Sequence, residues 1–225
     1  MKDDYARLVA EAGLDIGAIK LRPNDPFTWA SGFRMPIYND NRMFLFGPDH
    51  RRLITRGLRD LADHIGFTVI AGTSTAGISP ATSLADNYQC PLIYVRDKPK
   101  DHGLKNQIEG IDAESDLSGH HVLLVEDLIS TGGSSAKAVQ AIRDAKGGCV
   151  HCISIFNYEL SKGKEAFESL TPRCIVDSLL TYDKLLEIAK KKGYIDAQQT
   201  KMLAEWRQDP FGWGEKHGFP KVEKV

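Results

Sequence analysis

A chain of 225 residues is long enough to bury one full hydrophobic core with attached segments. Hydrophobic residues make up 42% of it and charged residues 26%, as in globular proteins, and no apolar run approaches the ~20 residues that cross a bilayer. The net charge of −1 argues against a nucleic-acid surface spread over the protein. Because the acidic, amphipathic N-terminus lacks a secretory signal pattern, we expect a cytoplasmic protein without membrane or nucleic-acid partners.

The first 45 residues predict a small lobe in front of the main domain. A short amphipathic helix is expected at residues 4–13, and a turn-rich strand segment at residues 19–42. That segment gathers the aromatic side chains Phe27, Trp29, Phe33 and Tyr38. It therefore offers flat apolar surface together with backbone amides.

Short apolar runs alternate with helical patterns between residues 46 and 181. Such alternation predicts an α/β domain around a mainly parallel five-stranded core sheet flanked by helices. The expected strands are 69–71, 92–95, 122–126, 150–156 and 174–180, and the expected helices are 50–65, 78–88, 134–146 and 162–170. A C-terminal segment, residues 182–225, should add two amphipathic helices at 183–192 and 197–207 and an aromatic, glycine-rich tail.

The stretch VLLVEDLISTGGSS, residues 122–135, carries the most specific chemical pattern. A buried strand delivers Glu126 and Asp127 to the sheet edge where α/β proteins bind ligands. Carboxylates there can accept hydrogen bonds from ribose hydroxyls or hold a hydrated divalent cation. Small residues then open a helix, whose amides and positive N-terminal end suit a phosphate. Taken alone, such a turn is about as often an ordinary strand-to-helix connection as a phosphate-binding loop.

A second stretch, residues 94–110, is rich in cations and has no helical or strand period. Residues 96–119 lack a strong apolar pattern, and a connection longer than about 12–15 residues is usually a functional lid or a disordered linker. A solvated surface run is the alternative, but only Asp101 is acidic between Lys98 and Lys105. The pattern therefore predicts a cationic lid that meets an anion, with the cations Arg96, Lys98, Lys100, His102 and Lys105.

A glycine-rich turn, AGTSTAG at residues 71–77, ends the first predicted core strand. Its amides could approach a pyrophosphate, although such turns are structural at least as often and this one lacks the GxxxxGK[ST] pattern.

Four cysteines raise the question of zinc or redox chemistry. Cys149 and Cys152 form a CxxC, but they lie in an apolar strand, where residues three apart should point to opposite faces. No second pair has ligand spacing, so reduced, packed thiols are predicted, including Cys90 and Cys174.

The acidic pair with its phosphate loop and the cationic lid together resemble the type I phosphoribosyltransferases. The lid sequence KDHG followed by NQIEG, and FTWASGFRMPIYNDNR at residues 27–42, are similar to the orotate-specific members of that family. The resemblance spans residues 27–156. It implies the type I phosphoribosyltransferase fold and transfer of the phosphoribosyl group of phosphoribosyl pyrophosphate (PRPP) to orotate, a step of pyrimidine (UMP) biosynthesis. It also implies Mg²⁺ as cofactor and a homodimer whose lid residues are shared across chains.

The resemblance also implies roles for individual residues. The catalytic residues would be Lys100, His102 and Asp127, with Arg96 as a further pyrophosphate contact. Glu126 and Asp127 would bind the ribose hydroxyls and, through water, the metal. The 5′-phosphate would be held by Leu128, Ile129, Ser130, Thr131, Gly132, Gly133 and Ser134. The pyrophosphate-side loop would be Thr73, Ser74 and Thr75, and the orotate-binding residues Ser130, Tyr38 and Arg34.

The chain departs from some family members at three positions. Ala30 and Ala76 stand where those members have Lys, and Tyr158 where they have Arg. We therefore expect backbone amides, supported by Arg34 or Arg42, to neutralise the orotate carboxylate. Two alternatives stay open: a phosphoribosyltransferase for another nucleobase, and a non-catalytic nucleotide-binding regulator on the same fold.

Overall fold

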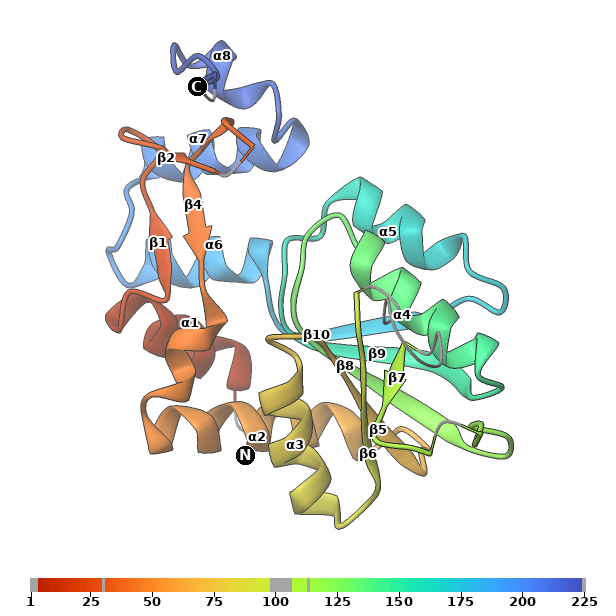
Figure 1. The fold of residues 1–225 in the computed structure, drawn as a ribbon. Helices are drawn as coiled ribbons and strands as arrows, with labels where there is room; N and C mark the ends of the chain where they lie inside the picture. The colour runs from red at the N-terminus through yellow and green to blue at the C-terminus, as the bar shows by residue number, and fades with distance from the viewer. Residues whose placement is uncertain (1–3, 30, 98–106, 113, 224–225) are drawn as a thin grey trace. The chain divides into compact units, whose positions relative to one another are not determined.

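The computed structural model describes residues 4–29, 31–97, 107–112 and 114–223 (Figure 1). It divides into two compact units, one of residues 1–46 together with 180–225, and one of residues 47–179. The N-terminal and C-terminal segments thus fold together as one unit, although the sequence treats them as separate attachments. We call residues 47–179 the core unit and the other the hood unit.

A six-stranded sheet organises the core unit, in the order β10-β9-β8-β5-β6-β7. β5 is parallel to both β6 and β8, and β8 is parallel to β9. The mainly parallel core sheet predicted from the sequence is confirmed, with one added edge strand. The strands are β5 (Val69–Thr73), β6 (Leu92–Val95), β7 (Ile108–Glu109), β8 (His121–Ile129), β9 (Gly148–Asn157) and β10 (Ile175–Thr181), the last of which continues into the hood unit.

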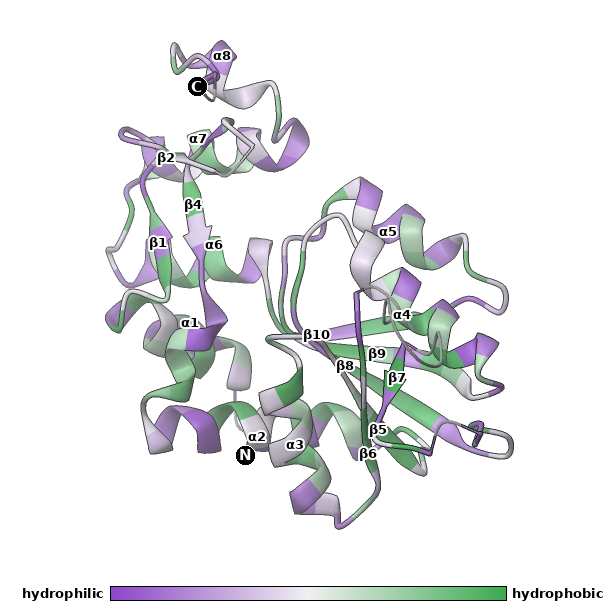
Figure 2. Ribbon diagram, viewed as in Figure 1, coloured by the Kyte–Doolittle hydropathy of each residue, from purple (hydrophilic) through white to green (hydrophobic). Residues whose placement is uncertain are grey.

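Helices cover both faces of this sheet (Figure 1). Alternate residues of the central strands, such as Ala71 and Leu124, join the core on the side of α4 and α5. Their neighbours Ile70 and Leu123 are also fully buried, which explains why the strands read as continuous apolar runs. Figure 2 shows these strands as the most hydrophobic part of the unit. The helices are α2 (Pro48–Ala62), α3 (Ile78–Tyr88), α4 (Gly133–Asp144) and α5 (Ser161–Glu168).

The edge strand β7 lies within the range predicted as a lid. Ile108 pairs with Val95 in antiparallel register, and Ile108 and Leu117 both belong to the buried core. The second half of the predicted lid, residues 107–112 and 114–119, is therefore anchored to the sheet. The two apolar residues are too far apart for a periodic signal, which is why the sequence did not reveal this anchoring. The cationic residues 98–106 lie outside the described residues.

The prediction for the CxxC pair is wrong in its geometry. Between His121 and Leu123 the register of β8 advances by two residues, while β9 advances by three, from Gly148 to His151. This irregularity re-aims the strand, and Cys149, Cys152 and Cys174 all join the same buried cluster as free thiols.

The hood unit combines two small two-stranded antiparallel sheets with helices. β1 (Ile19–Leu21) pairs with β4 (Ile37–Asn39), and β2 (Phe27–Thr28) pairs with β3 (Arg34–Met35). Helix α1 packs on α6, and α6 on α7. No described helix is long and apolar enough to cross a membrane. The helices are α1 (Tyr5–Asp15), the 3₁₀ helix η1 (Asn41–Leu45), α6 (Tyr182–Lys191), α7 (Ala197–Gln208) and α8 (Trp213–Lys216).

Candidate active site

The candidate site begins where β5 ends beside β8. Gly72 is the register partner of Val125, and the residues that follow are Thr73, the last of β5, and Glu126, after which β8 continues to Ile129. The Thr73 hydroxyl donates a 2.6 Å hydrogen bond to Oε1 of Glu126. Carboxyl ends of parallel strands are where open α/β sheets bind ligands, so this bond ties two predicted site segments at that edge.

Glu126 is the centre of a buried hydrogen-bond network. Its Oε1 also accepts the backbone N–H of Asp127 at 3.0 Å, and its Oε2 accepts the Ser135 hydroxyl at 2.8 Å. Glu126 is only 6% exposed and Ser135 only 1%. Three of the roughly four acceptor positions of a carboxylate are thus filled by protein donors. Through these hydrogen bonds Glu126 connects β5, β8 and α4. Ser135 was not identified as a site residue from the sequence.

Asp127 is the more accessible of the two carboxylates. Burial, followed by a hydrogen bond with Glu126 and the charge of Glu126, raises the pKa of Asp127 to about 7. The ionised form of Asp127 is therefore disfavoured in the free protein. A ligand that donates hydrogen bonds or brings positive charge to Asp127 would favour its ionised form.

The loop between β8 and α4 leads directly into the first turn of α4 (Figure 1). Gly132 takes the left-handed conformation, with φ of 70°, and α4 begins at the next residue. Thr131, Gly133 and Ser134 are exposed. The first amides of a helix have no partner within it, so the loop presents N–H donors and hydroxyls at the positive end of α4. The prediction of a phosphate loop fits Ser130 to Ser134, whereas Leu128 and Ile129 lie in β8 and Ile129 is buried in the core. No bound ligand tests the predicted contacts.

Helix α5 supports the same loop from behind. A Cβ on Gly163 would lie 2.7 Å from the carbonyl oxygen of Ser130, and one on Gly132 would lie 3.0 Å from that of Gly163. The two backbones approach this closely only because both residues are glycine. Gly163 was not identified from the sequence, since an isolated glycine in a helical pattern gives no sign of what it contacts.

The turn after β5 differs in part from the expectation that its amides face a pyrophosphate. The amide of Ser74 donates to the carbonyl of Val95 at 2.8 Å, so it is used within the fold. Thr73 is turned to Glu126, and Thr75 is exposed. A Cβ on Gly77 would lie 2.3 Å from Oγ1 of Thr73, so the turn requires glycine there. Of the three predicted residues, Thr75 is the one that faces solvent.

At the start of the lid, Arg96 is partly exposed and forms a 3.3 Å ion pair with Glu109. Its backbone amide and carbonyl both bond to Gln107. Arg96 is thus fixed at the base of the lid. Lys100 and His102, the predicted catalytic cations, lie outside the described residues.

The residues predicted to bind the base fall in different units. Ser130 belongs to the core unit, whereas Arg34 and Tyr38 belong to the hood unit. Tyr38 is 38% exposed and its ring packs 5.7 Å from that of Phe27. Arg34 donates from Nη2 to the carbonyl of Pro26 at 2.9 Å.

The two arginines proposed for the base carboxylate are not equivalent. Arg42 forms a two-pronged ion pair with Asp40, at 2.7 and 2.9 Å, and holds the pKa of that carboxyl below its ordinary value. No described carboxylate lies within ion-pair distance of Arg34, and its buried Nε has no hydrogen-bond partner among the described residues. Arg34 therefore keeps an uncompensated positive charge.

Two of the three positions that depart from the family pattern, Ala76 and Tyr158, are described by the structure. Tyr158 is 2% exposed and packs edge-on against Phe156, so it fills the core. Ala76 is partly buried in the turn after β5. Ala30 lies outside the described residues. Tyr158 cannot replace the charge of an arginine at this position.

A carboxylate pair and a phosphate loop on this sheet topology define a class of proteins that bind phosphorylated ribose. In agreement, the family model for the phosphoribosyl transferase domain matches residues 46–200.

Individual relatives narrow the class. The chain is 48% identical over 204 residues to an orotate phosphoribosyltransferase of Bacillus cereus, covering 90% of this chain and 94% of that protein. It is 43% identical over 209 residues to one of Listeria monocytogenes, covering 92% and 97%. The Mycobacterium tuberculosis orotate phosphoribosyltransferase solved with PRPP superposes with a TM-score of 0.60 at 25% identity, covering 81% and 99%. The chain belongs to the orotate phosphoribosyltransferase family.

Proposed function

We propose that this protein transfers the 5-phosphoribosyl group from PRPP to orotate, giving orotidine 5′-monophosphate and pyrophosphate in UMP biosynthesis. The observation that carries the proposal is the Glu126 network, which places Asp127 beside the start of α4. Family membership supports the choice of PRPP and orotate, because relatives that cover nearly all of this chain are orotate phosphoribosyltransferases.

The reaction displaces pyrophosphate from C1 of the ribose by a ring nitrogen of orotate. Bond breaking leaves positive charge on the sugar and negative charge on the departing pyrophosphate. In the proposed arrangement Asp127 accepts hydrogen bonds from the ribose hydroxyls, and the α4 start holds the 5′-phosphate. Lys100 and His102 neutralise the leaving group once the lid excludes water, where such charges act most strongly.

Mg²⁺ is the proposed cofactor, and the described residues fit it as a substrate-held ion. No group of three or more His, Cys, Asp or Glu among them could hold a metal ion. Mg²⁺ commonly keeps several waters and binds through one or two carboxylates plus substrate phosphates. Asp127, with its raised pKa, would be favoured in its ionised form by such a cation. When bound, the ion would supply charge neutralisation to the pyrophosphate.

Arg34 is the proposed partner of the orotate carboxylate, because its charge is uncompensated while that of Arg42 is taken by Asp40. Replacing Arg34 with alanine should raise KM for orotate ~10- to 100-fold, the value of a hydrogen bond to a charged group. Arg42→Ala is the matched control and should change that KM less than about threefold. Steady-state rates with varied orotate at saturating PRPP measure both. An unchanged KM in both variants would refute a role for either arginine.

The protein is further proposed to be a cytoplasmic homodimer in which the lid of one chain reaches the site of its neighbour. Mixing a Lys100→Ala variant with an Asp127→Ala variant should then restore part of the activity, because one site of each mixed dimer has both residues intact. Mixed dimers that stay inactive, after exchange of chains is verified by mass, would contradict shared sites.

A base panel tests the reaction itself. The loss of orotate in the presence of PRPP and Mg²⁺ is followed by absorbance, and parallel reactions contain adenine, hypoxanthine or uracil in place of orotate. We expect turnover with orotate and with none of the other three bases. Turnover with another base would indicate a different phosphoribosyltransferase, and no turnover with any base would favour a non-catalytic regulator on this fold.

A further inference from the structure

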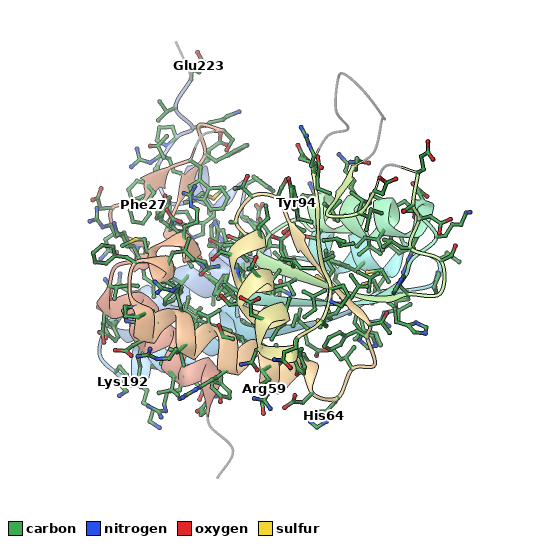
Figure 3. All side chains as sticks on the ribbon, turned by 60° about the horizontal axis from the view of Figure 1, so that its bottom comes forward. Phe27, Arg59, His64, Tyr94, Lys192 and Glu223 are labelled. Atoms are coloured by element: carbon green, nitrogen blue, oxygen red, sulfur yellow. The ribbon has the colours of Figure 1, made fainter. Side chains whose placement is uncertain are left out.

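The C-terminal tail, residues 209–223, packs on the part of the hood unit that carries Arg34. We call Trp29 and residues 31–35 the hood loop. Figure 3 labels Phe27 of the hood unit and Glu223, the last described residue of the tail. Tail and loop belong to the same compact unit, although almost the whole chain separates them in sequence.

The backbones of the tail and the hood loop approach each other closely at two places. The amide of Val222 donates to the carbonyl of Gly32 at 3.0 Å. Gly32 has φ of +83°, and a Cβ there would lie 2.2 Å from the carbonyl oxygen of Val222. At the start of α8, a Cβ on Gly214 would lie 3.1 Å from Cβ of Arg34. Two glycines, one on each side, thus permit the close approach.

Side chains close the same interface. The Phe33 ring packs 5.1 Å from that of Phe211, edge to face, and the Lys221 ammonium lies 4.5 Å above the Phe33 ring. The guanidinium of Arg34 lies 5.8 Å from the centre of the Phe219 ring. Phe219 in turn stacks on the buried Trp213. Aromatic and cation–π contacts of this kind each contribute to ordering the groups involved.

The tail is itself held in place independently of the hood loop. The Trp213 indole donates to the carbonyl of Met202 on α7 at 2.9 Å, and His217 bonds to Glu205 of the same helix at 3.0 Å. The amide of Phe219 donates to the carbonyl of Gly214 at 2.7 Å. Because the tail is anchored on α7, it is a fixed surface against which the loop can be ordered.

We propose that the tail positions Arg34 for the base, and that Phe219 is the positioning residue. The Phe219 ring lies on one side of the Arg34 guanidinium, and the carbonyl of Pro26 accepts a hydrogen bond from Nη2 of Arg34. These two contacts restrict the Arg34 side chain. A long, flexible arginine loses less conformational freedom on binding a carboxylate when it is already restricted. The inference rests on the proposed function, since it assigns the tail a role in binding orotate and none in binding PRPP.

Full-length Phe219→Ala tests the proposal through a split in kinetic constants. KM for orotate should rise about fivefold or more, while KM for PRPP stays within twofold. Lys216→Ala is the matched control, because Lys216 is exposed on α8 and forms an ion pair with Glu205 of α7 rather than with the hood loop. Gly214→Ala is a second change in the interface, because the added Cβ would lie 2.8 Å from the carbonyl oxygen of Phe219 and 3.1 Å from Cβ of Arg34. Circular dichroism and Tm establish that each variant folds.

A double-variant cycle decides whether Phe219 acts through Arg34. In an Arg34→Ala background, Phe219→Ala should add no further increase in orotate KM, because the group it positions is gone. Additive effects, or equal rises in both KM values for Phe219→Ala and Gly214→Ala, would overturn the proposal. Failure of the proposed function is distinguishable, since the unaltered protein would then not turn over orotate at all.

Discussion

Glu126→Ala is expected to reduce kcat/KM for PRPP by about 100-fold or more, although Glu126 is almost completely buried. The substitution leaves the Thr73 hydroxyl, the Ser135 hydroxyl and the Asp127 amide without their acceptor. Displacing catalytic groups by about 1 Å can cost 10²-fold in rate. Each buried donor left unpaired also costs about 1–3 kcal/mol, so the free energy of unfolding should fall by several kcal/mol. Initial rates and denaturant titration measure the two effects.

Glu126→Gln is the matched control for shape. Its amide oxygen can still accept from Thr73 and Asp127, and its amide nitrogen can donate to the hydroxyl oxygen of Ser135, which can rotate to accept. Stability should therefore stay within about 1 kcal/mol of the unaltered protein. With the neighbouring charge removed, the pKa of Asp127 should fall. An alanine variant that retained its KM for PRPP would show that the network does not position the sugar site.

Asp127→Asn should abolish most activity and yet stabilise the free protein above neutral pH. The neutral amide loses charge-assisted hydrogen bonds to the ribose hydroxyls, each of which contributes about 1.5–3 kcal/mol, so kcat/KM should drop about 100-fold. Stability responds in the opposite direction, because the raised pKa of Asp127 means that its ionised form is disfavoured in the folded state.

The pH window follows from the direction of that shift. The folded pKa of about 7 lies above the ordinary value of 3.8 for an aspartate, so the folded protein binds more protons than the unfolded chain between these values. The stability that Asp127 contributes is therefore complete below about pH 4 and is lost as pH rises through 7. Asp127→Asn removes this loss. At pH 8 its Tm should therefore exceed that of the unaltered protein, by about 2–4 °C for each kcal/mol gained in the free energy of unfolding. A lower Tm at pH 8 would contradict the account.

Much of the core unit could be predicted because its signals are local. Apolar runs buried on both faces marked the strands, and α3 begins and ends where its pattern predicted. The acidic pair near the end of β8 could be predicted for the same reason, since strand, carboxylates and helix start follow one another in sequence. These features depend on neighbours within a few residues.

Contacts between distant residues could not be predicted in the same way. Thr73 and Glu126 are 53 positions apart in the sequence. The sulfur of Met35 accepts a hydrogen bond from the indole N–H of Trp206, which is 171 positions away. The bulge that brings Cys149 beside the other thiols breaks the strand period on which the prediction relied. The role of Gly163 depends on a backbone that only the fold brings near. Such pairings are set by topology, and a single sequence carries no period for them.

The central claim is that Asp127 is the carboxylate that binds the ribose hydroxyls. Measuring proton release on PRPP binding is its most direct test. Calorimetry near pH 7, in buffers of different ionisation enthalpy, measures it for the unaltered protein and for Asp127→Asn. Because ribose hydroxyls favour the ionised carboxylate, binding should release roughly half a proton from a group whose pKa is about 7 in the free protein. The account predicts that this release is absent from Asp127→Asn. Equal release by both proteins would contradict it.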